Sequence, residues 1–229
     1  MLFRQLCDKE TSTYTYLIAD EVIKSAVLVD PVLEQVERDL QILQELGLTL
    51  RYSLETHIHA DHITGAKKLK EATGCLGVLP EHALLYCADR NITDGEILQL
   101  GDVEIKAIAT PGHTDNHVAY LINKLSVLTG DALLIRGCGR TDFQSGDAGT
   151  LYDSVTQRLF TLDDNTLVYP GHDYKGFTVS TIGEEKLFNA RFKGRNRDSF
   201  IELMNNLNLP YPQKMTVAVP ANEACGHIS

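Results

Sequence analysis

The sequence predicts an α/β fold in which two β-sheets pack face to face and helices cover the outside. Two observations lead to this prediction. A first group of short β-rich segments leads through a helix to a histidine-rich loop, and a second group of strands followed by helices completes the chain. Sheets and amphipathic helices must bury their apolar sides against other elements, so two such groups are expected to form packed layers.

The first third of the chain carries the first group of strands. Runs rich in β-branched and aromatic residues predict strands over Leu2 to Cys7, Thr13 to Ala19 and Ala26 to Val29. Apolar residues then recur at helical spacing from Leu33 to Leu46, and Gly47 is a typical stop. A strand over Tyr52 to Glu55 precedes the histidine-rich loop, and a helix over Ile63 to Ala72 follows it. The histidines therefore lie at the end of a strand, where open α/β sheets commonly bind ligands.

The remainder of the chain is first rich in strands and then helical. The expected strands are Ile97 to Leu100, Val103 to Ala109, Val118 to Ile122, Val127 to Thr129 and Leu167 to Tyr169. The expected helices are Thr150 to Leu159, Thr181 to Asn189 and Asp198 to Leu207. The tail is short and contains proline. We therefore expect residues 1–229 to form a single domain with a short C-terminal extension.

Composition and charge exclude several classes of protein. Hydrophobic residues make up 43% of the chain and charged residues 23%, as in globular proteins, which excludes disordered, collagen-like and membrane-spanning chains. The net charge of -10 repels phosphate backbones and anionic lipids, so neither nucleic acid nor a membrane is an expected partner. The N-terminal residues contain no long apolar run, which predicts a bacterial-type protein without a targeting segment, located in the cytoplasm.

The cysteines predict no disulfide framework. They are odd in number, scattered and without a Cys-x-x-Cys pair: Cys7, Cys75, Cys87, Cys138 and Cys225. We interpret most of them as small buried side chains in a reducing compartment. Cys138 lies near a candidate substrate motif, but packing is its expected role.

Candidate metal ligands are concentrated in one loop, with the sequence Thr56-His57-Ile58-His59-Ala60-Asp61-His62. Imidazole and carboxylate are ligands that first-row metals prefer. His57 and His59 alternate along an extended segment and can point to one side, whereas Asp61 and His62 begin the next turn. The loop is therefore predicted to bind a catalytic metal, and it can serve one site or two adjacent sites.

Three further loops supply candidate ligands directly after strands. Gly112 gives the backbone freedom to turn His113 inward. Asp131 ends an apolar strand, where a buried carboxylate needs a cation or several donors. His172 follows a strand and a Pro-Gly pair in the same way, whereas His117 is interpreted as structural. Four loops are thus expected to converge.

These four motifs, in this order, resemble those of the metallo-β-lactamase superfamily, whose fold is an αββα sandwich. Three longer segments resemble the persulfide dioxygenases, the family of the ethylmalonic encephalopathy protein: His57 to Gly65, Thr129 to Gln144 and His172 to Thr181. The segments Asn206 to Pro210 and Ala218 to Asn222 also fit. The resemblance covers almost the whole chain.

The resemblance implies one non-haem Fe(II) per subunit, bound by His57, His113 and Asp131. Two imidazoles and one carboxylate on one face of an octahedron leave open positions for a substrate sulfur and O2. The implied reaction oxidises glutathione persulfide with O2 and water to sulfite and glutathione, as in sulfide detoxification. A homodimer is compatible with the family.

The same resemblance assigns supporting roles to other residues. The groups that orient the ligands would be His59, Asp61, His62 and His172. Arg140 would hold a glutathione carboxylate through two parallel hydrogen bonds, and Tyr174 would add a hydroxyl group. The locally basic stretch Asn189 to Arg197 is interpreted as a solvated connection between helices.

Two alternatives remain at this stage. A complete binuclear ligand set is present, so a glyoxalase II-like thioester hydrolase acting on S-acylglutathione, with two metals and a bridging water, is physically possible. The Arg136 to Gln144 motif and the short region after His172 favour the dioxygenase. A non-catalytic metal-dependent sensor is disfavoured, because purely structural metal sites tend to be closed.

Overall fold

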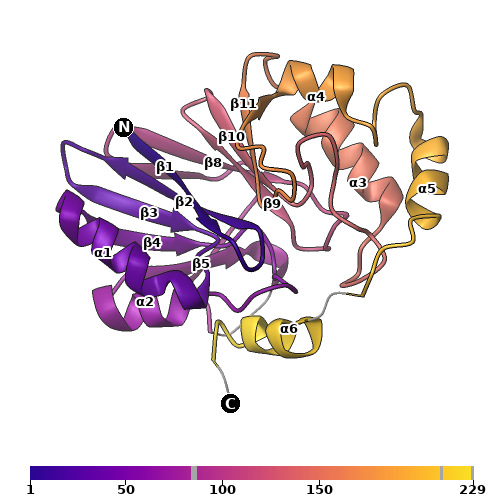
Figure 1. Ribbon diagram of the computed structural model, residues 1–229. Coiled ribbons are helices and arrows are strands. Elements are labelled where there is room, and N and C mark those ends of the chain that lie inside the picture. The colour runs from indigo at the N-terminus through magenta and orange to yellow at the C-terminus, as the bar shows by residue number, and fades with distance from the viewer. Residues whose placement is uncertain (84–86, 212–213, 228–229) are drawn as a thin grey trace. The chain divides into compact units, whose positions relative to one another are not determined.

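The computed structural model describes residues 1–83, 87–211 and 214–227. Backbone contacts divide the chain into two compact units. The first unit contains Met1–Ile92, Ile97–Ile105 and Tyr211–Ser229, and the second contains Thr93–Glu96 and Lys106–Pro210. Figure 1 labels the helices α1 to α6 and most of the strands.

The first unit is built on a mixed six-stranded sheet in the order β1-β2-β3-β4-β5-β6. Its strands are β1 Leu2–Asp8, β2 Thr13–Asp20, β3 Ser25–Val29, β4 Thr49–Leu54, β5 Leu76–Pro80 and β6 Arg90–Ile92. Strands β1 to β3 are antiparallel neighbours, and β3 to β6 are parallel. Helices α1 (Val36–Leu46) and α2 (Ala66–Thr73) lie along one face of this sheet (Figure 1). Leu43 and Leu69 of these helices share a core cluster with Leu17 and Leu28 of the strands.

The second sheet has the order β12-β11-β10-β9-β8-β7. Its strands are β7 Ile97–Leu100, β8 Val103–Ala109, β9 Val118–Ile122, β10 Ser126–Gly130, β11 Leu167–Pro170 and β12 Ser180–Thr181. Strand β10 pairs parallel with β11 and antiparallel with β9, so this sheet is also mixed. Strand β7 and the start of β8 are counted with the first unit.

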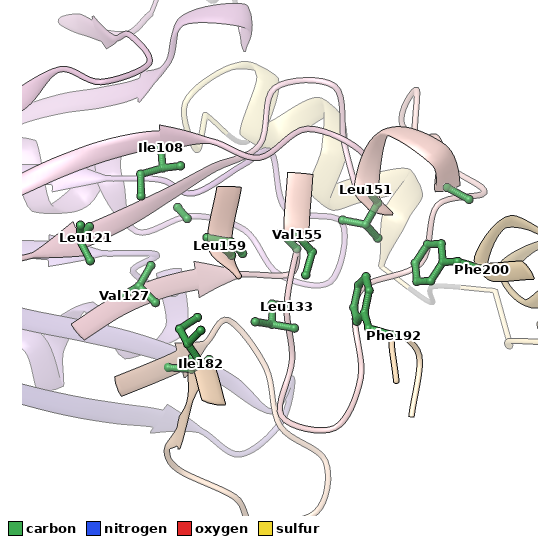
Figure 2. Packing of buried hydrophobic residues seen from close by; sticks show 14 of the residues in the cluster. Ile108, Leu121, Val127, Leu133, Leu151, Val155, Leu159, Ile182, Phe192 and Phe200 are labelled. Carbon is green, nitrogen blue, oxygen red and sulfur yellow. The ribbon is translucent and has the colours of Figure 1, made fainter. Parts of the chain in front are cut away.

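The core of the second unit lies between its strands and its helices α3 (Ala148–Ser154), α4 (Ile182–Phe188) and α5 (Arg197–Asn205). A π-helical turn, Val155–Leu159, continues α3. Figure 2 shows Leu151 and Val155 of this helical segment in the same cluster as Leu133, Phe192 and Phe200. The rings of Phe192 and Phe200 stack with their centroids 4.8 Å apart.

The strands and helices predicted from the sequence are present, with small shifts at their ends. The helix expected from Ile63 begins instead at Ala66. Ile63 and Thr64 are extended instead of helical: Leu33 N–H donates to Ile63 O at 2.9 Å, and Thr64 forms a β-bridge with Val32. The short strands β5, β6 and β12 were not predicted, nor was helix α6 (Met215–Glu223), which contains Pro220. Proline in a helix interior counts against a helix in any local pattern.

The cysteines were predicted to form no disulfide framework, and this prediction was wrong for one pair. Cys87 and Cys225 form a disulfide with Cα atoms 5.9 Å apart, whereas the other three cysteines are free. The two partners are 138 residues apart, so no local spacing indicates the pair. Cys75 is buried as expected, but Cys7 is exposed. Within the described residues, none of the helices combines the length and the apolar character needed to cross a membrane.

Candidate metal centre

The histidine-rich loop of the first unit begins where β4 ends. Strands β3 and β4 are parallel, with Val29 opposite Leu54, so the residues that follow them meet at one edge of the sheet. Asp30 follows β3, and its carboxylate accepts hydrogen bonds from Thr56 N–H at 2.7 Å and from the Thr56 hydroxyl at 2.9 Å. Asp30 and Thr56 are each 1% exposed. A buried carboxylate therefore fixes the first residue of the loop.

Thr56 in turn determines which nitrogen of His57 faces outward from this contact. The Thr56 hydroxyl gives its proton to Asp30, so its oxygen can only accept from His57 Nδ1, 2.9 Å away. Nδ1 therefore carries the ring proton, and Nε2 is the nitrogen with a lone pair for a metal. Such outer-shell partners commonly set the tautomer of a metal-binding histidine.

His59 has the opposite arrangement. Its Nε2 lies 3.1 Å from Asp30 Oδ1 and 3.5 Å from Glu55 Oε2, and all three residues are buried. Burial by itself lowers the pKa of His59, but the nearby carboxylates outweigh that effect and raise the pKa to about 9. Burial raises the pKa of Glu55 to about 8. Because Nε2 faces these carboxylates, a metal can reach His59 only through Nδ1.

Asp61 and His62 contact each other at the end of the loop. His62 Nδ1 lies 2.9 Å from Asp61 Oδ2, which also accepts a hydrogen bond from the Thr13 hydroxyl at 3.1 Å. His59 Nδ1 lies 3.9 Å from Asp61 Oδ1. One ligand atom from each of His59, Asp61 and His62 lies within 4.8 Å of the others. The candidate ligands of a second metal are thus present in the first unit.

In the second unit, His113 is oriented by backbone contacts. His113 Nδ1 lies 2.7 Å from Arg140 O, which can only accept, so Nδ1 carries the proton. His113 Nε2 faces Asp131 Oδ2 at 3.7 Å. Two donors that are each about 2.1 Å from one ion can be at most about 4.2 Å apart, so a single ion can bind both. Gly112 is required for this turn, because its φ is +132° and a Cβ would lie 2.3 Å from Leu151 N.

Asp131 is held at both its backbone and its side chain. His172 Nδ1 donates to Asp131 Oδ1 at 2.6 Å, which leaves Oδ2 as the oxygen that faces His113. Asp131 N–H donates to His117 Nε2 at 3.0 Å, and His117 Nδ1 therefore donates to the Thr110 hydroxyl at 2.8 Å. Both nitrogens of His117 are engaged, which agrees with its interpretation as structural.

Comparisons with known proteins decide the family. The model of the metallo-beta-lactamase superfamily matches residues 8–172. The mouse protein "Persulfide dioxygenase ETHE1, mitochondrial" is 49% identical over 99% of this chain and 89% of its own length, and the human protein of that name is 48% identical over the same shares. The crystal structure of ETHE1 from Myxococcus xanthus has 56% identity and a TM-score of 0.97, and the match covers 99% of this chain and all of that one.

The chain belongs to the persulfide dioxygenase family.

The predicted fold class is therefore confirmed: this persulfide dioxygenase family member has the metallo-β-lactamase fold, with two mixed β-sheets flanked by helices. A hydroxyacylglutathione hydrolase from Rhodospirillum rubrum is more distant, at 36% identity over 72% of this chain and 63% of its own length.

The two predicted substrate residues of this family member lie close in sequence to metal-site residues of the second unit. Arg140 supplies the carbonyl that orients His113. Its guanidinium forms a two-pronged ion pair with Asp142 at 2.7 and 2.8 Å, and its Nη1 donates to Pro210 O. Tyr174 is 73% exposed and stacks on His172, with ring centroids 6.1 Å apart. Two of the guanidinium N–H groups that were predicted to bind a substrate carboxylate are thus already bonded to Asp142.

Two other predictions concern the second unit, and the first of them is confirmed. Cys138 packs against the core cluster, with its sulfur 3.8 Å from Met204 Sδ. The basic stretch connects α4 and α5 as predicted, but it is not solvated throughout, because Asn189 and Phe192 within it are buried.

The sequence assigned no role to Asp30, Thr56 and Asn222, which hold the histidine-rich loop Thr56 to His62 and its continuation to Thr64, together called the metal loop below. Asp30 is a carboxylate directly after a buried strand, as Asp131 is. The same pattern could therefore have identified Asp30 from the sequence. Thr56 and Asn222 carry no such signal, because a threonine or an asparagine becomes a support only through the partner that it meets.

Proposed function

We propose that the protein is an iron-dependent persulfide dioxygenase that oxidises glutathione persulfide with O2 and water to sulfite and glutathione. The observation that carries this proposal is the likeness to persulfide dioxygenases along 99% of the chain. The Arg136 to Gln144 segment, which motivates the dioxygenase assignment over the hydrolase, lies beside His113 through Arg140 O.

In this proposal His57, His113 and Asp131 bind one Fe(II) per subunit. Their donor chemistry fits this ion: both histidines carry their ring proton on Nδ1 and offer Nε2, and Asp131 offers Oδ2. Two neutral imidazoles and one carboxylate are the ligand set of non-haem Fe(II) oxygenases. When bound, Fe(II) supplies the redox chemistry that joins a persulfide sulfur to O2, and the protein supplies orientation and electrostatics.

The remaining polar residues of the site position the ligands. His172 holds Asp131 by its second oxygen, at 2.6 Å, and so limits the carboxylate to one oxygen for the metal. Asp61 is engaged by Thr13 and His62 on the same oxygen atom. His59 is held through Nε2 by buried carboxylates. In this proposal, His59, Asp61, His62 and His172 support the iron ligands and do not bind iron themselves.

Arg140 and Tyr174 bind the glutathione part of the substrate in this proposal. Arg140 can donate to a substrate carboxylate through the N–H groups that Asp142 does not use, or can exchange Asp142 for that carboxylate. Tyr174 is exposed and stacked on His172, so its hydroxyl can reach a bound peptide without a change in the core.

A hydrolase with two metals is the second candidate, and a specific observation favours it. The ligand atoms of His59, Asp61 and His62 lie close enough for a second ion, and the Rhodospirillum rubrum hydrolase is 36% identical. Two metals would lower the pKa of a bridging water, which would then attack a glutathione thioester.

One experiment separates the two candidates. The protein is purified anaerobically, its metals are measured, and oxygen uptake with glutathione persulfide is compared with hydrolysis of S-lactoylglutathione. We expect about one iron per subunit and oxygen uptake. Two zinc ions with thioester hydrolysis and no oxygen uptake would overturn the dioxygenase proposal. Asp131→Ala should abolish iron retention and Asp61→Ala should leave iron bound, whereas equal loss would favour a binuclear centre.

Three sequence predictions remain to be tested by other means. Light scattering of the purified protein tests the homodimer, and limited proteolysis tests whether residues 1–229 form a single domain. Cell fractionation tests the predicted cytoplasmic location. The Cys87–Cys225 disulfide gives a reason to make this test, because disulfides are more typical of oxidising compartments than of the cytoplasm.

A further inference from the structure

The C-terminal helix α6 contacts the metal loop through one buried side chain, Asn222. Its Nδ2 group donates to His59 O and to His62 O, each at 2.8 Å, and its Oδ1 accepts from Thr64 N–H at 2.8 Å. These bonds join residues that are 158 to 163 positions apart in the sequence. Asn222 is 3% exposed. One amide thus fixes three backbone positions of the loop that contains His57.

The chemistry of these contacts requires an amide. Carbonyl oxygens can only accept, so both N–H groups of Nδ2 are needed, and a backbone N–H can only donate, so Oδ1 is needed as well. An aspartate has the same shape, but it would direct a carboxylate oxygen at the two carbonyls of His59 and His62. Leaving such groups without a donor inside the protein costs the full desolvation of each.

Other residues keep α6 against the loop. Ala218 and Ala221 of the same helix are buried, at 1% and 7% exposure. Gly226 passes so close to the loop that a Cβ there would lie 2.8 Å from Thr64 O. Beyond the helix, the Cys87–Cys225 disulfide ties the end of this segment to the residues before β6. The segment from Met215 to Gly226 is therefore anchored on both sides of Asn222.

The anchoring disulfide can be reached by small molecules. A cavity of about 400 Å³ in the first unit is lined by both cysteines and by Asn222, Thr64 and His57. Cys87 and Cys225 are each half-buried. A low-molecular-weight dithiol can therefore reduce the bridge: it loses two electrons and two protons and becomes a disulfide, and the two cysteines become thiols.

We propose that Asn222 is a positioning residue for the metal loop and that the Cys87–Cys225 disulfide anchors it there. This inference rests on the proposed function in taking His57 as a metal ligand and iron as the bound metal. The contacts to His59, His62 and Thr64 set the course of the loop, and the loop sets the direction in which His57 presents Nε2.

The first test compares Asn222→Asp and Asn222→Ala with the wild-type holoprotein. Hydrogen exchange of the backbone amides in residues 57–66 and the rate of iron transfer to a chelator are measured. Because buried polar groups lose their partners, we expect exchange and iron release to rise on the order of tenfold or more in both variants. The aspartate variant should be at least as strongly affected as the alanine variant, which a role in packing alone does not predict.

Asn206→Asp is the matched control. Asn206 is an exposed residue after α5, where its Nδ2 donates to Glu202 O, and its substitution should change neither measurement. Iron release and exchange at wild-type rates in Asn222→Asp would overturn the proposed role of Asn222. These measurements do not depend on which reaction the metal catalyses, so they stay informative if no oxygen uptake is found.

The second test needs no change in the loop. Dithiothreitol should increase exchange of the same amides in the wild-type protein severalfold. It should have no further effect on Cys225→Ser, in which the bridge is already absent and exchange is already raised. An equal response of the two proteins to dithiothreitol, or no response in either, would overturn the anchoring role of the disulfide.

Discussion

The Thr56 hydroxyl is the contact through which the buried Asp30 orients His57. In Thr56→Val the shape of the side chain is kept, but Asp30 loses the donor at 2.9 Å and His57 Nδ1 loses its acceptor at 2.9 Å. A hydrogen bond to a charged group contributes about 1.5–3 kcal/mol, and one between neutral groups about 0.5–1.5 kcal/mol. We therefore expect Thr56→Val to lower the free energy of unfolding by about 2–4 kcal/mol.

The same substitution should weaken metal binding. Without its acceptor, the His57 ring is free to rotate and to exchange tautomers, and loss of an outer-shell partner typically costs about 10–100-fold in metal affinity. Thr56→Ser is the control, because it keeps the hydroxyl and loses only a methyl group, worth about 1 kcal/mol of stability. The assays are chemical denaturation and competition for iron with a chelator. Equal iron affinity in the valine and serine variants would refute the role of the hydroxyl.

Three further predictions concern stability and thiol chemistry. The Cys87–Cys225 disulfide closes a loop of 138 residues, so its reduction should lower the free energy of unfolding by up to about 5 kcal/mol in the chain-entropy model, measured by denaturation with and without reductant; an unchanged midpoint would contradict this. Burial raises the pKa of the Cys138 thiol to about 12, so iodoacetamide at pH 8 should label the exposed Cys7 and spare Cys138, as checked by mass spectrometry. Burial also raises the pKa of Asp39, so stability falls as the pH rises from the ordinary carboxyl value toward that raised pKa, and the full cost is present above it. Asp39→Asn keeps the oxygen that accepts from Arg38 and should stabilise the protein at pH 7, and this gain should shrink as the pH falls toward the ordinary carboxyl value of 3.8; a gain independent of pH would argue against the charge as its cause.

The elements that could be predicted from the sequence are those whose pattern is local. Helix α1 has apolar residues at helical spacing and a glycine with a φ of +63° at its end, and both features are visible in the chain itself. Strand β6 has only three residues, too few for an alternating pattern to be recognised. Helix α6 has a proline in its interior and is held by buried contacts of Ala218, Ala221 and Asn222. Tertiary packing outweighs local preference there, and no local pattern reports it.

In the candidate site, too, some residues could be predicted from the sequence and others could not. His57 was predicted as a ligand because first-row metals prefer imidazole and because of the family resemblance, whereas its neighbour Thr56 acts only through the groups that it contacts. His113 and His117 are both loop histidines four residues apart, yet one faces a carboxylate oxygen and the other accepts a backbone N–H. Residue type therefore indicates which side chains can bind a metal, and hydrogen-bond partners determine which atom they present. For that reason, substitution of a ligand tests which side chains bind the metal, whereas substitution of Thr56 or Asn222 tests how the protein positions those side chains.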